Sequence, residues 1–370
     1  MILSQTDDQG FFRETTAKFL AEQAPVAVIR RLRKDPLGFD PNYWRRGASL
    51  GWTALLVAEA YGGGSLTGAG VVDLTLVAGE FGAHAAPGPL LSTNVVAAAL
   101  NDTGSHTDVL TDLVAGDTVA SWSGIRFGAD GQPDTAVELQ LEANNIVLNG
   151  VASPVEAAQP ADHLLVAARS RNGLSQLLVP TGAPGMLMTP LRSVDLTRRF
   201  WRVRFDEVRV SRAAIVGDEG QAASALDRQI QLALVIASAE MVGAMQTAFD
   251  ITVEWAFDRY SFGRPLASYQ ALKHRFADMK TWLEASHAIA DAAASAVDSN
   301  EADAAELASA AMAVVADYGS ELLQDCVQMH GGIGVTFEHD LHLFLRRHTL
   351  NRGLYGTPAQ HRQRLASLAI

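Results

Sequence analysis

The spacing of hydrophobic residues divides the chain into three stretches of different character. From about residue 8 to about residue 100, apolar side chains such as Phe12 and Leu20 recur at helical intervals. From Thr118 to about Val216 the pattern changes to short β-branched runs separated by Gly, Pro, Asn and Asp, which is typical of strands. After Gly220 the chain returns to long Ala- and Leu-rich segments with few helix breakers. The sequence therefore predicts helices, then strands, then helices.

This change of pattern places the expected domain boundaries. We expect an N-terminal helical domain over 1–116, a middle β domain over 117–218 and a C-terminal helical bundle over 219–370. The last third is predicted to contain three long helices, over about 222–259, 269–298 and 301–329. No internal repeat is found, so neither a solenoid nor a propeller is indicated.

One predicted strand near the end of the β region changes phase. The residues from Trp201 to Phe205 alternate as a half-buried strand should, whereas Val208 and Val210 fall on the opposite phase. We therefore expect a bulge or bend near Asp206.

Composition narrows the classes of function. The 370 residues include 29 Lys and Arg against 41 Asp and Glu, a net charge of −12, which is the wrong sign for a nucleic-acid partner. No uninterrupted apolar stretch reaches the roughly 18 residues that a membrane helix needs, and the first residues do not have the pattern of a secretion signal. We therefore expect a cytoplasmic protein. The single cysteine, Cys326, excludes an internal disulfide, and its apolar neighbours predict a small buried residue.

The first motif with chemical content lies between two of the predicted long helices. It reads Arg259-Tyr260-Ser261-Phe262-Gly263-Arg264-Pro265-Leu266, with Gln270 shortly after it. A guanidinium offers forked donors to a pyrophosphate, an amide can hold a ribose or a base edge, and glycine permits a tight turn. The string therefore suits a dinucleotide.

The second motif follows the third long helix and reads Gln328-Met329-His330-Gly331-Gly332-Ile333-Gly334. Because it follows a helix and not a strand, it does not fit a Rossmann fingerprint. Taken alone, paired glycines there would only end the helix.

With the order of elements, these motifs resemble the acyl-CoA dehydrogenases, flavoproteins that oxidise the Cα–Cβ bond of acyl-CoA thioesters. The resemblance spans nearly the whole chain. It is also carried by Leu50-Gly51-Trp52, Ala58-Glu59-Ala60-Tyr61-Gly62-Gly63, Leu148-Asn149-Gly150, Ala161-Asp162 and Phe205-Asp206-Glu207-Val208-Arg209-Val210. It implies an α+β fold with an N-terminal helical domain, a middle β-barrel or sandwich and a C-terminal four-helix bundle. It also implies FAD as cofactor, an acyl-CoA substrate and an electron-transfer flavoprotein as partner.

In this family the two motifs hold the ADP half of an FAD that is bound mainly by the neighbouring subunit. Carried over to this sequence, the resemblance implies that six residues serve a FAD shared across a subunit interface: Arg259, Phe262, Gln270, Gln328, Gly331 and Gly332.

The family's catalytic base, a glutamate, is missing from both of its usual positions. Tyr355 stands before Gly356-Thr357, where the glutamate commonly lies, and a phenol is a poor general base near neutral pH. Ala233 occupies the alternative position on the earlier helix. Glu240 shares that helix face but lies about 10 Å further along the axis, and Glu338 is interpreted as structural or solvent-facing.

The strings that hold the flavin ring in the family are also altered. The first reads Ser121-Trp122-Ser123-Gly124-Ile125-Arg126-Phe127-Gly128-Ala129-Asp130, and the second, Ser153-Pro154-Val155-Glu156-Ala157-Ala158, lacks the usual Trp. Trp122 could stack on a flavin, but a buried strand aromatic is the favoured role.

The chain thus keeps the motifs that bind the ADP half of a neighbouring subunit's FAD, and it lacks the base and the ring-binding strings expected of its own FAD site. The resemblance is to the non-catalytic subunits of actinobacterial steroid-degrading acyl-CoA dehydrogenases, α2β2 assemblies with a homologous catalytic subunit. Two alternatives remain open: a self-sufficient flavoenzyme that uses Tyr355 or Glu240, and a structural or ligand-binding relative without flavin chemistry.

Two further clusters are expected to be solvent-exposed. His339 and His342 lie near Asp340, but Arg346 and Arg347 follow them, so surface histidines are favoured over a metal site. The basic cluster Arg30, Arg31, Arg33 and Lys34 is expected to be a solvated face, with CoA phosphate binding as an alternative.

Overall fold

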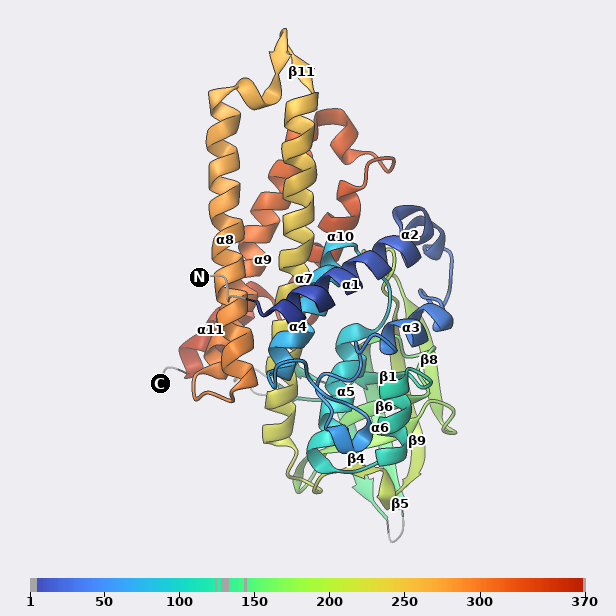
Figure 1. Ribbon diagram of the computed structural model, residues 1–370. Helices are drawn as coiled ribbons and strands as arrows, with labels where there is room; N and C mark the ends of the chain where they lie inside the picture. The colour runs from blue at the N-terminus through green and yellow to red at the C-terminus, as the bar shows by residue number, and fades with distance from the viewer. Residues whose placement is uncertain (1–4, 124, 128–132, 143–144, 369–370) are drawn as a thin grey trace.

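The computed structural model describes residues 5–123, 125–127, 133–142 and 145–368. It contains helices, then a sheet, then a helical bundle, as the sequence predicted. The bundle rises above the sheet, and the N-terminal helices lie beside both (Figure 1). Whether the domain boundaries lie at the expected residues stays a prediction.

The first third is helical. Its helices are α1 (Asp7–Gln23), α2 (Val26–Leu32), α3 (Pro41–Ala48), α4 (Gly70–Ala83), α5 (Leu90–Thr103) and α6 (Thr107–Ala115). Thr6 and Gln9 form a capping box that fixes the start of α1. Trp52 is fully buried and packs edge-to-face on Phe81, which joins the loop after α3 to α4.

The middle third forms an eight-stranded sheet with the order β10-β7-β6-β4-β5-β9-β8, and β1 pairs with β6 in parallel. The strands are β1 (Ala120–Ser123), β4 (Val137–Leu141), β5 (Asn145–Glu156), β6 (His163–Ser170), β7 (Gly173–Pro180), β8 (Met186–Leu191), β9 (Phe200–Ser211) and β10 (Ile215–Val216). β2 (Arg126–Phe127) and β3 (Pro133–Asp134) form a separate pair.

The predicted bulge in β9 is confirmed. The pairing of β5 with β9 shifts register between Leu148 and Gly150, opposite the step from Val208 to Phe205. Glu207 has a φ of +50° and donates its N–H to the Asn149 Oδ1 atom at 2.9 Å. The extra residue lets the side chains before and after it both face the core, although they lie on opposite phases of the sequence.

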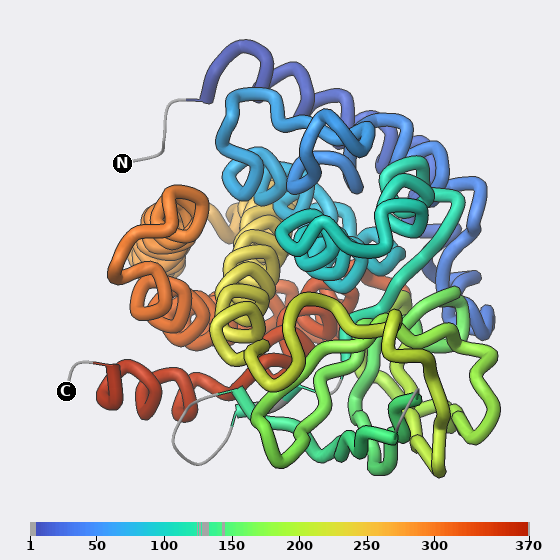
Figure 2. The backbone as a smooth tube through the Cα atoms, turned by 90° about the horizontal axis from the view of Figure 1, so that it is seen from below, coloured from blue at the N-terminus to red at the C-terminus, as the bar shows by residue number. Residues whose placement is uncertain are grey.

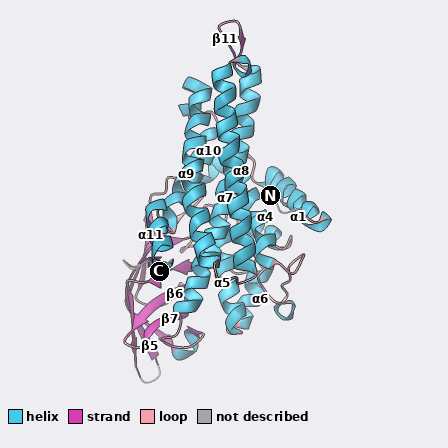
Figure 3. Ribbon diagram, turned by 90° about the vertical axis from the view of Figure 1, so that its left-hand side faces the viewer, coloured by secondary structure: helices cyan, strands magenta, loops and turns pink. Residues whose placement is uncertain are grey.

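The last third is built on long helices. They are α7 (Ala223–Asp258), α8 (Gln270–Asp298), α9 (Ala304–His330), α10 (Leu341–Leu354) and α11 (Pro358–Leu368). A small hairpin, β11 (Tyr260–Ser261) and β12 (Arg264–Pro265), joins α7 to α8 at the far tip of the bundle (Figures 1 and 3). The first two of the three predicted long helices have nearly the expected bounds, and the third begins three residues later than expected, at Ala304.

Helix α7 is the central element. It packs against α4, α8, α9 and α10, and in the view from below it lies among helices from both ends of the chain (Figure 2). An 18-residue window of α7 is apolar enough to cross a membrane, but 83% of that window is buried inside the protein. The apolar run therefore belongs to the core helix of the fold.

Helices α4 and α7 touch backbone to backbone through glycines. A Cβ atom on Gly82 would lie 1.8 Å from the Glu240 carbonyl oxygen, and one on Gly243 would lie 1.9 Å from the Gly79 carbonyl oxygen. This close crossing fixes the position of α7 and therefore the place of Glu240.

Candidate functional site

The first motif lies at the exposed tip of the bundle. Arg259 ends α7, and its guanidinium lies 5.8 Å from the centre of the Trp255 ring. Phe262 is 97% exposed in the hairpin, with a φ of +51°. Gln270 is the first residue of α8 and is also exposed. The side chains that the resemblance assigns to the cofactor are thus open to an incoming molecule.

The second motif lies at the end of α9. Gln328, Gly331 and Gly332 are exposed, and Gly331 has a φ of +61°, which ends the helix. A Cβ atom on Gly331 or Gly332 would meet no other atom within 4 Å. The glycines therefore leave open space beside the backbone, as the approach of a ligand requires.

A stack of rings brings the two motifs together. His330 lies parallel to Trp255 at 5.1 Å, and its Nδ1 atom lies 2.8 Å from the Cys326 carbonyl oxygen. The Trp255 Nε1 atom and the His330 Nε2 atom are buried and have no hydrogen-bond partner among the described residues. Because Arg259 also contacts Trp255, both motifs form one surface at the same end of the bundle. The exposed groups of this surface suit the ADP half of a dinucleotide: they are a guanidinium, two amides and open glycines.

Hydrophobic side chains surround this surface. They share substantial exposure and come from the end of α7, from the hairpin and from the short turn after α9: Phe257, Tyr260, Phe262, Ile333 and Val335. Clustered apolar exposure of this kind is typical of a surface that another protein covers.

A second region contains Tyr355, which the resemblance places where a family member would carry its base. The Tyr355 ring follows α10 and lies 5.7 Å from the Trp122 ring, at an angle of 37°. Trp122 is buried in β1 and donates its Nε1–H to the Gln229 Oε1 atom at 2.9 Å, so the favoured role as a buried strand aromatic is confirmed. The cavity between these rings, Pro154 and Phe200 measures only about 30 Å³.

That cavity is too small for a flavin ring. Pockets for ligands of this size usually have volumes of about 300–1,000 Å³. The described residues therefore do not fit an isoalloxazine at this position. Burial, together with the nearby charges of Glu156 and Glu240, raises the pKa of the Tyr355 phenol, while Arg198 opposes the shift. Ala233, at the alternative base position, is fully buried in α7 and carries no titratable group.

Beside Tyr355 lies a buried network of charges. Arg198 is 4% exposed and holds Glu156 through two parallel bonds, Nε to Oε1 at 2.5 Å and Nη2 to Oε2 at 2.7 Å. Its Nη1 atom donates to Asn351 at 2.5 Å and to Glu240 at 3.3 Å. This geometry fixes the guanidinium on all sides.

Arg347 completes the network from α10. Its Nη1 atom donates to the Glu240 Oε1 atom at 2.5 Å, and its Nε atom donates to Asp195. Burial alone would raise the pKa of Asp195, but Arg347 and the Thr197 N–H hold it below its usual value. Glu240 accepts from Arg347 at Oε1 and from Asn351 and Arg198 at Oε2, so both carboxylate oxygens are engaged by the buried network. No local pattern in the sequence signals this network, because its ion pairs join segments that lie 42 to 152 positions apart along the chain.

Two expectations of solvent exposure are wrong in part. His342, expected at the surface, is only 8% exposed, because α10 packs into the core and the His342 ring stacks on Phe337 at 4.4 Å. In the basic cluster, Arg30 pairs with Asp340 at 2.8 Å and Arg33 lies over the Phe337 ring. The cluster therefore contacts the segment before α10, where only solvent was expected. The described residues contain no group of three or more His, Cys, Asp or Glu side chains placed to hold a metal ion.

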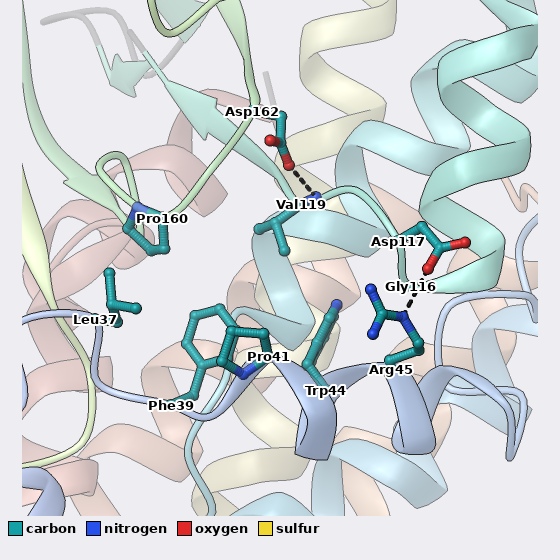
Figure 4. A pocket seen from close by; sticks show the side chains of 10 residues that line it. All are labelled: Leu37, Phe39, Pro41, Trp44, Arg45, Gly116, Asp117, Val119, Pro160 and Asp162. Carbon is teal, nitrogen blue, oxygen red and sulfur yellow. Dashed lines mark hydrogen bonds and ion pairs between the residues drawn. The ribbon is translucent and has the colours of Figure 1, made fainter.

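A separate pocket of about 170 Å³ lies between α3 and the start of the β domain (Figure 4). Apolar side chains, among them Phe39 and Trp44, form its wall, and an ion pair between Arg45 and Asp117, 2.6 Å long, lies at one side. No residue of the first or second motif lines this pocket, so it is separate from the surface at the end of the bundle.

Comparisons with known proteins place the chain in a family. The model of the acyl-CoA dehydrogenase N-terminal domain matches residues 6–113, and that of the C-terminal domain matches residues 210–369. The chain belongs to the acyl-CoA dehydrogenase family. FAD is the cofactor expected of a member.

The chain is also similar in sequence to individual acyl-CoA dehydrogenases. The chain is 29% identical to IpdE2 of Mycobacterium tuberculosis, over 99% of this chain and 98% of that protein. It is 28% identical to FadE34 of the same organism but spans only 49% of that longer protein.

Solved structures show the same fold. A variant of the Tcur3481–Tcur3483 steroid acyl-CoA dehydrogenase aligns with a TM-score of 0.88 and 25% identity, over 98% of each chain. Butyryl-CoA dehydrogenase of Megasphaera elsdenii aligns with a TM-score of 0.89 and 22% identity, over 99% of each chain. The predicted three-part architecture is confirmed.

Proposed function

We propose that this chain is the non-catalytic subunit of an FAD-dependent acyl-CoA dehydrogenase and completes the FAD site of a homologous catalytic subunit. The assembly would be a cytoplasmic α2β2 heterotetramer that desaturates an acyl-CoA and passes electrons to an electron-transfer flavoprotein. One observation carries the proposal. The end of the bundle is open and suited to an ADP group, whereas the space beside Tyr355 is filled.

The open end supplies binding groups. Arg259 would hold the pyrophosphate with its forked donors, while Gln270 and Gln328 would hold polar edges of the ADP moiety. Gly331 and Gly332 would let the backbone approach, and Phe262 would pack against the cofactor or the partner. FAD bound there supplies the acceptor for the hydride that leaves the substrate Cβ atom. In this proposal the glutamate that removes the α proton belongs to the partner.

The filled space argues against a self-sufficient enzyme. Tyr355 and Trp122 close the ring position, and the one nearby acid on α7, Glu240, is held by Arg347 and Asn351. A symmetric homodimer would contain two such filled positions. Pairing with a competent homologue gives one complete site per heterodimer, which explains why the lending residues are kept.

The substrate class is inferred from similarity. The Tcur3481–Tcur3483 structure, named as a steroid acyl-CoA dehydrogenase, covers 98% of this chain. We therefore propose that the substrate of the assembly is a steroid whose side chain carries the CoA thioester, and that the partner binds most of it.

The test is co-expression with a homologous acyl-CoA dehydrogenase, followed by measurement of FAD content and acyl-CoA oxidation. We expect about one FAD per two chains in the complex and none in this chain purified alone. Arg259→Gln should lower the FAD content and the activity of the complex. Its matched control is Arg264→Gln, because Arg264 lies in the same hairpin but packs over the Tyr269 ring at 3.8 Å. Full flavin occupancy of a homomer would defeat the proposal.

A further inference from the structure

A strongly basic hollow lies between the segment after α2, the connection from β8 to β9, and α10. Its volume is about 370 Å³. Four arginines line it, none of which belongs to the two motifs: Arg33, Arg192, Arg199 and Arg346. In a chain with a net charge of −12, such a concentration of positive charge needs an explanation.

The charge of Arg199 is fixed in place. Its Nε atom donates to the Asp35 carbonyl oxygen at 3.0 Å and its Nη1 atom to the Leu196 carbonyl oxygen at 2.8 Å, and Nη2 donates to the Leu32 carbonyl oxygen. Carbonyl groups orient a guanidinium without neutralising its charge. Burial lowers the pKa of Arg199, with Asp195 and Asp35 opposing the shift.

The two acids that act on Arg199 are occupied. The Asp195 carboxylate lies in the wall but accepts from Arg347 and Thr197. The Asp35 Oδ1 atom accepts the backbone N–H groups of Leu37 and Gly38. Within the described part of the chain, none of the four lining arginines forms an ion pair.

The other three arginines leave donors toward the hollow. Arg346 gives one hydrogen bond, to the Val194 carbonyl oxygen at 3.1 Å, and Arg192 is exposed with no hydrogen bond to the described residues. Arg33 lies over one face of the Phe337 ring, while His342 stacks on that ring at 22°. Phe337 is the one aromatic ring among the described residues of the wall, and both of its faces have these neighbours. The hollow therefore offers charge and forked donors in place of base stacking.

We propose that this hollow binds a small molecule through its di- or polyphosphate group. Guanidinium groups match phosphate oxygens in pairs, and several of them converging on one concavity favour a multiply charged anion over a single carboxylate. The volume lies within the range of about 300–1,000 Å³ that small-ligand pockets have. The phosphate could be free pyrophosphate or part of a nucleotide-type coenzyme. The inference does not rest on the proposed function, because none of the four arginines belongs to the two motifs that would hold FAD.

The experiment is calorimetric titration of the full-length chain with sodium pyrophosphate, ADP and coenzyme A at low ionic strength. We expect pyrophosphate to bind and Arg192→Gln to weaken that binding about tenfold or more, because a charge-assisted contact is lost. Arg33→Gln is a second variant. The control is Arg171→Gln, which removes the same charge from an exposed turn between β6 and β7.

Comparing the three titrants also shows whether the hollow binds a free anion or a coenzyme. Tighter binding of ADP or coenzyme A than of pyrophosphate would support a coenzyme, and equal binding would support the free anion. Affinity for pyrophosphate that is unchanged in both Arg192→Gln and Arg33→Gln would overturn the proposal. So would a heat signal that sodium chloride of equal ionic strength reproduces, since that is screening and not a site.

Discussion

Tyr355 and Trp122 face each other at 5.7 Å between their ring centres, so the residue that the resemblance aligns with a catalytic glutamate is part of a closed aromatic contact. The phenol also lies beside the buried charges of Arg198, Glu156 and Glu240. The position where the resemblance predicts a glutamate is therefore not an isolated side chain. It is a packed region that joins β1, α10 and the charge network.

This relationship predicts that restoring the glutamate alone restores nothing. Tyr355→Glu should leave the chain without flavin and without acyl-CoA oxidation, because the new carboxylate adds a like charge beside Glu156 and Glu240 and does not create room for the ring. Visible absorbance of the purified variant measures the flavin directly. Tyr355→Phe is the control that keeps the ring contact, and it should fold like the wild type. Stoichiometric flavin in Tyr355→Glu would show that the filled space can open.

The buried network predicts a large cost for removing one member. Arg347→Met leaves Asp195 and Glu240 without their shared guanidinium, and breaking such a buried pair costs about 3–5 kcal/mol of unfolding free energy. Urea denaturation followed by circular dichroism measures the loss.

The adjacent residue provides a matched control. Arg346 is only half-buried and gives one hydrogen bond, to a carbonyl oxygen, so Arg346→Met should cost less than about 1.5 kcal/mol. Equal losses for the two variants would contradict the role given to the network.

The crossing of α4 and α7 predicts a contrast between two glycines. Gly243→Ala would place a Cβ atom 1.9 Å from the Gly79 carbonyl oxygen, so the helices must separate, and we expect a loss of about 1–3 kcal/mol of unfolding free energy. Gly79→Ala is the matched test, because its nearest neighbour is a carbonyl oxygen 4.0 Å away. Alanine is the better helix former, so Gly79→Ala should be neutral or stabilising by up to about 1 kcal/mol. Thermal unfolding of both variants measures the difference, and a similar loss in both would mean that the crossing is not set by backbone contact.

Much of this fold is predictable from local pattern, and much of the site is not. The helices of the last third follow from apolar periodicity and sparse breakers, and the bulge near Asp206 follows from a change of phase within one strand. The charge network has no such local signature. Arg198 and Glu156 are 42 positions apart, and Arg347 and Asp195 are 152 apart, so only the packing of α10 against the β domain brings them together. The same packing buries His342, which the sequence analysis expected at the surface, and the neighbouring Arg347.

The burial of His348 predicts a loss of stability in mild acid. Its Nε2 atom lies 3.0 Å from the Ala316 carbonyl oxygen, and burial lowers its pKa to about 4. In the unfolded chain the ring takes up a proton near its ordinary pKa of about 6.5, so the unfolded state binds more protons between these values. The stabilisation is complete above about pH 6.5 and is lost as the pH falls toward about 4. This one group contributes up to about 3 kcal/mol of that loss.

Replacing the histidine tests this sign. His348→Gln retains an amide that can donate to Ala316 and cannot titrate, so the unfolding free energy of the variant should fall less steeply between pH 6.5 and 4 than that of the wild type. His274→Gln, at an exposed position on α8, is the control and should keep the wild-type slope. Urea denaturation at a series of pH values gives both slopes. Parallel curves for His348→Gln and the wild type would mean that the buried ring does not govern the acid sensitivity of the fold.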